Sequence, residues 1–121
     1  TLTLIKDTDM ATQRKIERQM IQAIVDERPH WQQGNTRVEC IGNHANVYLH
    51  GHRIAHYNRY DQSLCVNNCG YETNITKSRL NVLIDFVFGG VGNGIFQSNW
   101  IWYLVRDGQQ SEFPSNEWVA L

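Results

Sequence analysis

Hydroxyl, amide and cationic side chains gather at the start of a helical pattern in the second half of the chain. The first turn of a helix presents unpaired backbone N–H groups and the positive end of the helix dipole, so it favours an anion such as phosphate. We therefore predict a phosphate-binding site at this helix start. A base attached to that phosphate would stack on Tyr71 or on Trp100. The predicted phosphate contacts are Thr73, Thr76, Lys77, Ser78, Arg79 and Asn81.

The same side chains also have a purely structural interpretation. Thr73 or Thr76 can cap the helix, because a threonine oxygen accepts hydrogen bonds from first-turn N–H groups. In that case Lys77 and Arg79 would simply be solvated. On a helical projection Arg79 flanks the apolar face, so it could also reach toward a neighbour or a ligand. From the sequence, both the cap and the anion site remain open.

Four histidines and two cysteines lie near one another in the middle of the chain. Imidazole and thiolate are preferred zinc ligands, but a His-x-His pair is interrupted by Gly51 at an expected turn. The Cys-x-x-x-Cys unit matches no compact zinc-finger spacing. We therefore expect no metal and no cofactor, and we interpret the cysteines, three in all, as reduced thiols. The clustered residues are His44, His50, His52, His56, Cys65 and Cys69.

Histidines can also act as a general acid and base, as in a metal-independent nuclease or phosphodiesterase. The candidates for catalysis are His50, His52 and His56. Such a mechanism needs two imidazoles that converge on one phosphorus, whereas a tight turn at Gly51 would separate them. We therefore expect binding rather than catalysis, and phosphoester cleavage stays as an alternative.

Glycines and aromatic residues dominate the region after the second predicted helix. The glycine-rich run 89–94 follows a helix and precedes a strand, the reverse of a phosphate-binding glycine loop, so it predicts a flexible connection. Trp100 and Trp102 are two residues apart, so they would share one face of a strand. The opposite face would carry Ile101 and Tyr103. One face would pack in the core, and the other would be a stacking platform or a dimer contact.

Two helices are predicted from apolar residues at helical spacing. The first begins near Asp9 or Ala11 and ends at Arg28, because Pro29 cannot continue a helix and restricts the residue before it. The second runs from about residue 76 to residue 87. Their apolar stripes are Ile16, Met20, Ala23 and Ile24 in the first, and Leu80, Leu83, Ile84 and Val87 in the second.

Strands are predicted where apolar and polar residues alternate. Residues 37–67 indicate a meander of short strands with turns at Gly42, at Gly51 and over residues 58–62. The other expected segments are strands at 95–97, at 100–105 and at a short stretch ending at Phe113, a short strand at 2–5, a loop at 30–35 and a tail at 114–121.

Together these elements predict one α+β domain over residues 1–121, an antiparallel sheet of about five to seven strands packed with two helices. The 121 residues are 41% hydrophobic with a net charge of -1, which excludes a disordered chain and a general nucleic-acid coater. Nucleic-acid binding is therefore less expected and would need a local patch. No apolar run reaches the ~18 residues of a membrane span, and no signal-peptide core follows Thr1, so we expect a soluble, intracellular protein without membrane contact.

Four sequence blocks stand out together, at residues 47–55, 68–81, 94–97 and 102–104. They contain the patterns HGxxIA, NCGYxTNxTKSRLN, GIFQ and WYL, of which the TNITKSRLN segment is the most specific. Across residues 47–107 the chain resembles a group of small bacteriophage proteins of unassigned function. The resemblance implies a phage protein in the cytoplasm of an infected bacterium, and it implies no activity.

Small phage accessory proteins commonly bind a host protein or a nucleotide signal of bacterial defence, so the resemblance favours binding over turnover. We expect a non-catalytic binding protein for a phosphate-bearing small molecule, which would sequester a nucleotide signal. The alternatives are an inhibitor of a host protein that uses an aromatic surface patch, and the small nuclease described above. A homodimer through the aromatic strand or the first helix is also expected.

Overall fold

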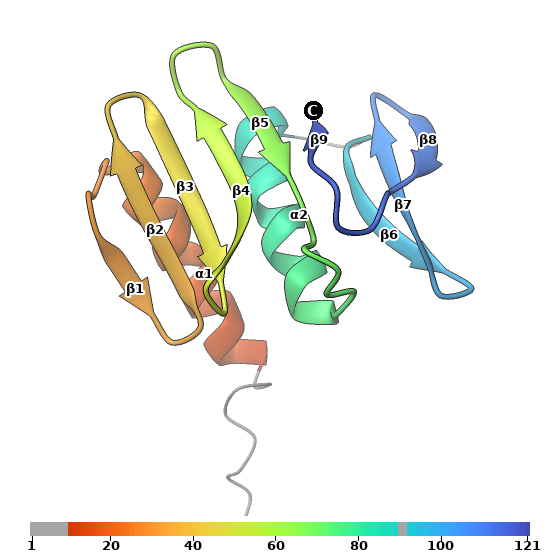
Figure 1. The fold of residues 1–121 in the computed structure, drawn as a ribbon, viewed down its shortest axis with the longest axis horizontal. Coiled ribbons are helices and arrows are strands. Elements are labelled where there is room, and N and C mark those ends of the chain that lie inside the picture. The colour runs from red at the N-terminus through yellow and green to blue at the C-terminus, as the bar shows by residue number, and fades with distance from the viewer. Residues whose placement is uncertain (1–9, 90–91) are drawn as a thin grey trace, which may run out of the picture.

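The computed structural model describes residues 10–89 and 92–121. The strand expected at residues 2–5 and two residues of the glycine-rich run therefore lie outside the described part. Within that part the chain forms two helices and nine strands, arranged in two antiparallel sheets of six and three strands (Figure 1). The prediction of an α+β fold is confirmed, with the strands divided between two sheets.

The first helix, α1 (Met10–Val25), buries its predicted apolar stripe. Met20, Ala23 and Ile24 are at most 1% exposed and belong to the hydrophobic core. The predicted end at Arg28 is too late, because the helix ends at Val25, where Glu27 adopts a φ of 55° and the N–H of Arg28 donates to the Ala23 carbonyl at 3.0 Å. Because the stripe faces the protein's own sheet, the first helix cannot use it for a homodimer contact.

The larger sheet is a meander that the C-terminal tail extends by one strand. Its order is β1-β2-β3-β4-β5-β9, and each neighbouring pair is antiparallel. The prediction of a loop at residues 30–35 is wrong, because Trp31 pairs with Val38 and packs against the core. The strands are β1 (Trp31–Gln33), β2 (Thr36–Ile41), β3 (His44–Leu49), β4 (His52–Asn58), β5 (Ser63–Val66) and β9 (Val119–Ala120).

Both helices lie on one face of the larger sheet, behind the strands in Figure 1. A β-bulge in β4 sets which side chains face them. Tyr48 lies opposite Arg53 and Val47 lies opposite Ala55, so Ile54 is the additional residue. Ile54 and Ala55 are consequently both buried, while Arg53 stays on the outer face of the sheet. In the described part of the chain no helix covers this outer face.

The second helix, α2 (Asn74–Phe88), joins the larger sheet to the smaller one. Ile95, Trp102 and Leu104 of the smaller sheet are buried in the same core as α2. The Asn81 amide accepts from the backbone N–H of Ile95 at 2.7 Å and donates to its carbonyl at 2.9 Å, which holds the edge strand to the helix. The strands are β6 (Gly94–Ser98), β7 (Ile101–Arg106) and β8 (Gln109–Glu112).

Trp100 does not lie in a strand, so the prediction that it shares a strand face with Trp102 is wrong. Asn99 and Trp100 form the tight turn between β6 and β7, with φ angles of 51° and 69°. Trp100 is 86% exposed at this turn, whereas Trp102 is buried.

Neither helix in the described part is long and apolar enough to cross a bilayer.

Candidate functional site

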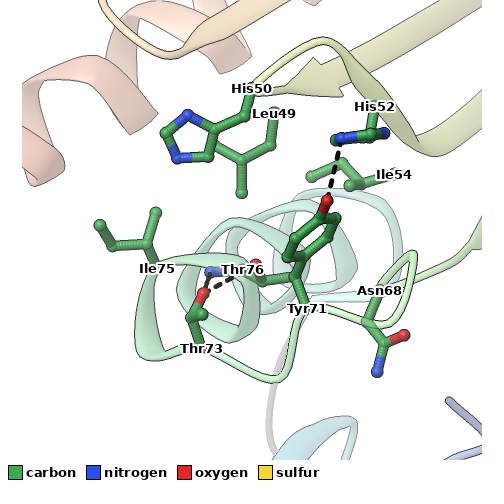
Figure 2. A pocket seen from close by; sticks show the side chains of 9 residues that line it. All are labelled: Leu49, His50, His52, Ile54, Asn68, Tyr71, Thr73, Ile75 and Thr76. Atoms are coloured by element: carbon green, nitrogen blue, oxygen red, sulfur yellow. Dashed lines mark hydrogen bonds between the residues drawn. The ribbon is translucent and has the colours of Figure 1, made fainter. Parts of the chain in front are cut away.

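A cavity of about 300 Å³ lies between the turn that joins β3 to β4 and the first turn of α2 (Figure 2). Its apolar lining comes from Leu49 and Ile54 in the sheet and from Ile75 in the helix. The polar side chains around it are imidazoles, a phenol, hydroxyls and an amide. The nine lining residues are Leu49, His50, His52, Ile54, Asn68, Tyr71, Thr73, Ile75 and Thr76.

The β3–β4 turn has two central residues in the left-handed region, His50 with a φ of 51° and Gly51 with a φ of 82°. Two-residue turns of this kind match the twist of antiparallel strands, and glycine adopts the second position without strain. The turn brings His50 and His52 to the cavity, where Figure 2 shows them on opposite sides.

Tyr71 reaches the turn from the loop that precedes α2. Its hydroxyl lies 3.3 Å from Nε2 of His52, and the centres of the two rings are 5.0 Å apart. The loop itself is shaped by Asn67, whose Oδ1 accepts from the N–H of Cys69 at 2.7 Å, and by Asn68, which accepts from Gly70 at 2.8 Å. Tyr71 is half-exposed, so its ring forms an outer wall of the cavity.

The start of α2 borders the cavity, and Thr73 is its N-cap. Thr73 has extended backbone angles, and its Oγ1 accepts from the N–H of Thr76 at 3.2 Å. The two hydroxyl oxygens are 2.9 Å apart. The predicted cap is therefore confirmed at Thr73. The N–H groups of Asn74 and Ile75 precede the first intrahelical bond, so the helix offers them no acceptor.

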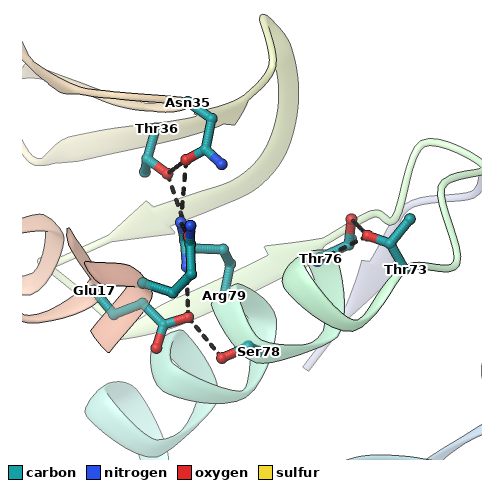
Figure 3. A network of polar contacts seen from close by, with 8 residues as sticks. Glu17, Asn35, Thr36, Thr73, Thr76, Ser78 and Arg79 are labelled. Carbon is teal, nitrogen blue, oxygen red and sulfur yellow. Dashed lines mark hydrogen bonds and ion pairs between the residues drawn. The ribbon is translucent and has the colours of Figure 1, made fainter. Parts of the chain in front are cut away.

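Arg79 lies in the protein interior and is 0% exposed (Figure 3). Its Nη1 is 2.7 Å from the Glu17 carboxylate, and its Nε donates to the hydroxyl of Thr36 at 2.9 Å. The Nη2 atom donates to side-chain oxygens of Asn35 and Gln13. Arg79 therefore ties α2 to α1 and to the β1–β2 turn, and its guanidinium does not reach the cavity.

Other predicted phosphate contacts also hold α2 in place. Ser78 donates to the Glu17 carboxylate at 2.6 Å. Lys77 donates to the side chain of Gln97 at 3.4 Å, and Asn81 binds the backbone of β6. Of the predicted ligand-binding residues, the structure brings Tyr71, Thr73 and Thr76 together at the cavity. It places Lys77, Ser78, Arg79 and Asn81 against neighbouring elements, and Trp100 at a separate turn.

The histidines named as catalytic candidates divide between two faces of the larger sheet. His50 and His52 line the cavity, whereas His56 lies on the outer face with its Nε2 3.0 Å from Nδ1 of His44. Burial, followed by the nearby His44 and Arg53, lowers the pKa of His56 below its usual value. The three candidates therefore do not converge on one point, although two of them do share the cavity.

No group of three or more histidine, cysteine or acidic side chains converges in a metal-binding arrangement among residues 10–89 and 92–121. Cys40, Cys65 and Cys69 are free thiols. Burial raises the pKa of the Cys40 thiol, and it also raises the pKa of Cys69. At Cys40 and Cys69 burial therefore favours the neutral thiol over the reactive thiolate form.

Sequence reasoning missed the apolar part of this cavity. Leu49 and Ile54 belong to the strand alternation and Ile75 precedes the predicted second helix, and only the fold shows that the three surround an open space. The local signal that was available is His50-Gly51, a dipeptide suited to a tight hairpin turn. This dipeptide predicts that the two histidines lie on either side of a tight turn. It does not predict which helix end lies opposite the turn.

Comparison with known proteins gives one family match. The model of the family described as Kyanoviridae Gp96 protein matches residues 13–120 of the chain. No curated protein and no solved structure matches the chain.

Proposed function

The chain belongs to the Kyanoviridae Gp96 protein family, a family of phage proteins, and from that premise we propose that it is a non-catalytic binding protein. Its ligand is a phosphate-bearing small molecule with a planar ring, held in the cavity between the β3–β4 turn and α2. In an infected bacterium such a protein would sequester a nucleotide signal of host defence.

The proposal rests on one observation: an apolar cavity with an aromatic side chain in its wall lies beside the first turn of a helix. Ile54 and Ile75 provide an apolar surface for a planar ring, and Tyr71 can stack on it from the outside. The first turn of α2 favours an anion at the same cavity, because its leading N–H groups lack helical acceptors. A ring with an attached phosphate matches both halves of the site.

The size of the cavity limits the ligand. Its volume of about 300 Å³ lies at the lower end of the range for small-molecule sites, which is roughly 300–1,000 Å³. This favours one ring system with one phosphate group over a dinucleotide. Mononucleotides and their cyclic forms are the chemical class that fits.

The electrostatics of the lining favour binding over catalysis. The lining residues include no lysine, arginine, aspartate or glutamate. The cavity therefore has no fixed cation that could stabilise the negative charge that develops on a phosphate group during cleavage.

Isothermal titration calorimetry with the four nucleoside 5′-monophosphates, the matching nucleosides and inorganic phosphate tests the proposal. We expect binding of at least one monophosphate, with weaker binding of its nucleoside and of phosphate alone. Tyr71→Ala should remove most of the affinity. Tyr60→Ala is the matched control, because Tyr60 is 83% exposed and does not line the cavity. Equal binding by both variants, or no binding of any nucleotide, would reject the proposed site.

A second candidate function rests on the exposed side of the smaller sheet. The rings of Phe96 and Tyr103 stack there with centres 5.3 Å apart. Trp100 projects from the neighbouring turn with a φ of 69°, an uncommon conformation for a bulky residue. Backbone outliers of this kind gather at functional sites. This patch would serve an inhibitor of a host protein.

Trp100→Asn removes the indole but preserves the turn, because asparagine adopts the left-handed conformation readily. If the patch binds a host protein, a partner retained by the wild type from a bacterial lysate should be lost with Trp100→Asn and kept with Tyr60→Ala. The same patch is the surface through which we propose a homodimer. Light scattering of the wild type and of Trp100→Asn tests that proposal, and a monomeric wild type would contradict it.

A further inference from the structure

The outer face of the larger sheet carries an unusual row of side chains across three strands. Arg37 of β2 lies opposite Tyr48 of β3, and Tyr48 lies opposite Arg53 of β4. The Arg37 guanidinium carbon is 4.0 Å from the centre of the Tyr48 ring. The Arg53 guanidinium carbon is 5.1 Å from the centre of the Trp118 ring, which extends the row toward the C-terminus. We call these four residues the arginine–aromatic row.

The bulge in β4 determines that the row lies on the outer face of the sheet. Because Ile54 is the additional residue, Arg53 stays outward and its Nη1 donates to the Asn46 side chain at 3.2 Å. Without the bulge, strict alternation would turn either Arg53 or His56 toward the helices. Both helices pack on the opposite face, and no described segment covers the row.

The charge of this face differs from that of the whole chain. At the outward positions of β2 to β5 in the described structure, Arg37 and Arg53 face a single carboxylate, that of Glu39. Glu39 lies 3.2 Å from Arg37, which leaves Arg53 without an acidic partner there. The local formal charge is thus +1, whereas the chain carries -1 overall. His44 and His56 lie on the same face, with Nδ1 of His44 3.0 Å from Nε2 of His56.

We propose that the arginine–aromatic row binds single-stranded nucleic acid, in addition to the small-molecule site on the other side of the sheet. Guanidinium planes and aromatic rings both stack on unpaired bases, and arginine also pairs with phosphate. Rings displayed on an open sheet are a recurrent platform for single strands, whose bases can be splayed out. A duplex hides its bases and would gain only the phosphate contacts.

Fluorescence anisotropy of labelled 12-nucleotide oligo(dT) and oligo(rU), in about 50 mM salt, tests the proposal. With two arginines engaged, the logarithm of the association constant should fall with the logarithm of salt concentration with a slope of about -1.4. Tyr48→Ala should weaken binding about tenfold, as the loss of one stacking ring does. Arg53→Lys keeps the charge but loses the stacking plane, so it should also weaken binding.

Arg18→Ala is the matched control, because Arg18 is an exposed arginine of α1, a helix that lies on the opposite face of the larger sheet. Melting curves show which variants stay folded. If Tyr48→Ala unfolds, Arg53→Lys alone decides the question. The proposal is overturned if the folded wild type leaves the anisotropy unchanged, if Arg18→Ala and Arg53→Lys weaken binding equally, or if a duplex or a polyglutamate peptide binds as tightly. Loss of binding in Tyr71→Ala with the row intact would place the strand in the cavity, which also overturns it.

Discussion

The hydroxyl of Tyr71 meets Nε2 of His52 at 3.3 Å, and this contact joins the loop before α2 to the β3–β4 turn. The two segments both line the cavity, but they belong to no common strand or helix. Since both side chains are exposed, the contact contributes little to global stability. Its main consequence is to hold an aromatic wall in place beside the start of α2.

Removing only this hydrogen bond should affect the ligand more than the fold. Tyr71→Phe keeps the ring and loses the hydroxyl, so we expect a fewfold loss of nucleotide affinity and a change below about 1 kcal/mol in the free energy of unfolding. Tyr71→Ala should lose far more affinity with a similarly small change in stability. Calorimetry and urea denaturation check the two quantities. A Tyr71→Ala variant that binds like Tyr71→Phe would show that the ring is not part of the site.

Arg79 should prove to be a residue of the fold. Arg79→Ala leaves the Glu17 carboxylate buried without its cation, so we expect a loss of about 3–5 kcal/mol in the free energy of unfolding. Lys77→Ala, two residues earlier on the partly exposed side of α2, should change it by less than about 0.5 kcal/mol. Urea denaturation of both variants measures the difference. Near-equal stabilities would contradict the buried network seen in the structure.

The β3–β4 turn allows the imidazole of His50 to be removed without harming the hairpin. Asparagine followed by glycine is the preferred pair for this turn, so His50→Asn should preserve or raise the melting temperature while lowering affinity for an anionic ligand. Gly51→Ala has the opposite effect on stability. Although a Cβ there would meet no atom within 4 Å, the left-handed backbone should cost about 1–2 kcal/mol. Thermal melts and calorimetry report on both variants. A lower melting temperature for His50→Asn would show that the turn is of another kind.

Acid should destabilise the protein partly through His56. The folded-state pKa of His56 is below its unfolded value of 6.5, owing first to burial and then to His44 and Arg53. Below pH 6.5 the unfolded chain therefore binds more protons than the folded one, and the free energy of unfolding falls as the pH falls through the folded-state pKa. The stability of the wild type should decline between about pH 7 and about pH 5 more steeply than that of His56→Gln. Parallel pH profiles from urea denaturation would exclude this contribution.

Sequence patterns predicted the framework of the fold because its signals are local. The apolar stripes located both helices, although α1 ends at Val25 and not at the predicted Arg28, and alternation with turn residues located the meander. β1 has three residues and no alternation, so only its pairing with β2 reveals it. The strand predicted at residues 100–105 begins one residue too early, because Asn99, a residue that favours tight turns, forms a turn together with Trp100.

The candidate site depended on long-range relationships that no local pattern contains. The polar residues at the start of α2 do fall near one another, but Arg79 has its carboxylate partner 62 residues earlier in the chain. A cationic residue beside an apolar stripe looks the same in sequence whether it is solvated or paired inside. Likewise, His50 and His52 line the cavity only because the β3–β4 turn lies beside the start of α2.

The most direct test of the cavity as a phosphate site is a nuclear magnetic resonance titration of the ¹⁵N-labelled protein with the monophosphate that binds best in calorimetry. If the ligand binds there, the amide shifts should cluster in the β3–β4 turn and in the segment from Asn68 to Thr76, with Thr73, Asn74 and Ile75 among the largest. Shifts centred instead on Trp100 or on the outer face of the larger sheet, or no saturable shifts at all, would contradict the cavity as the phosphate site.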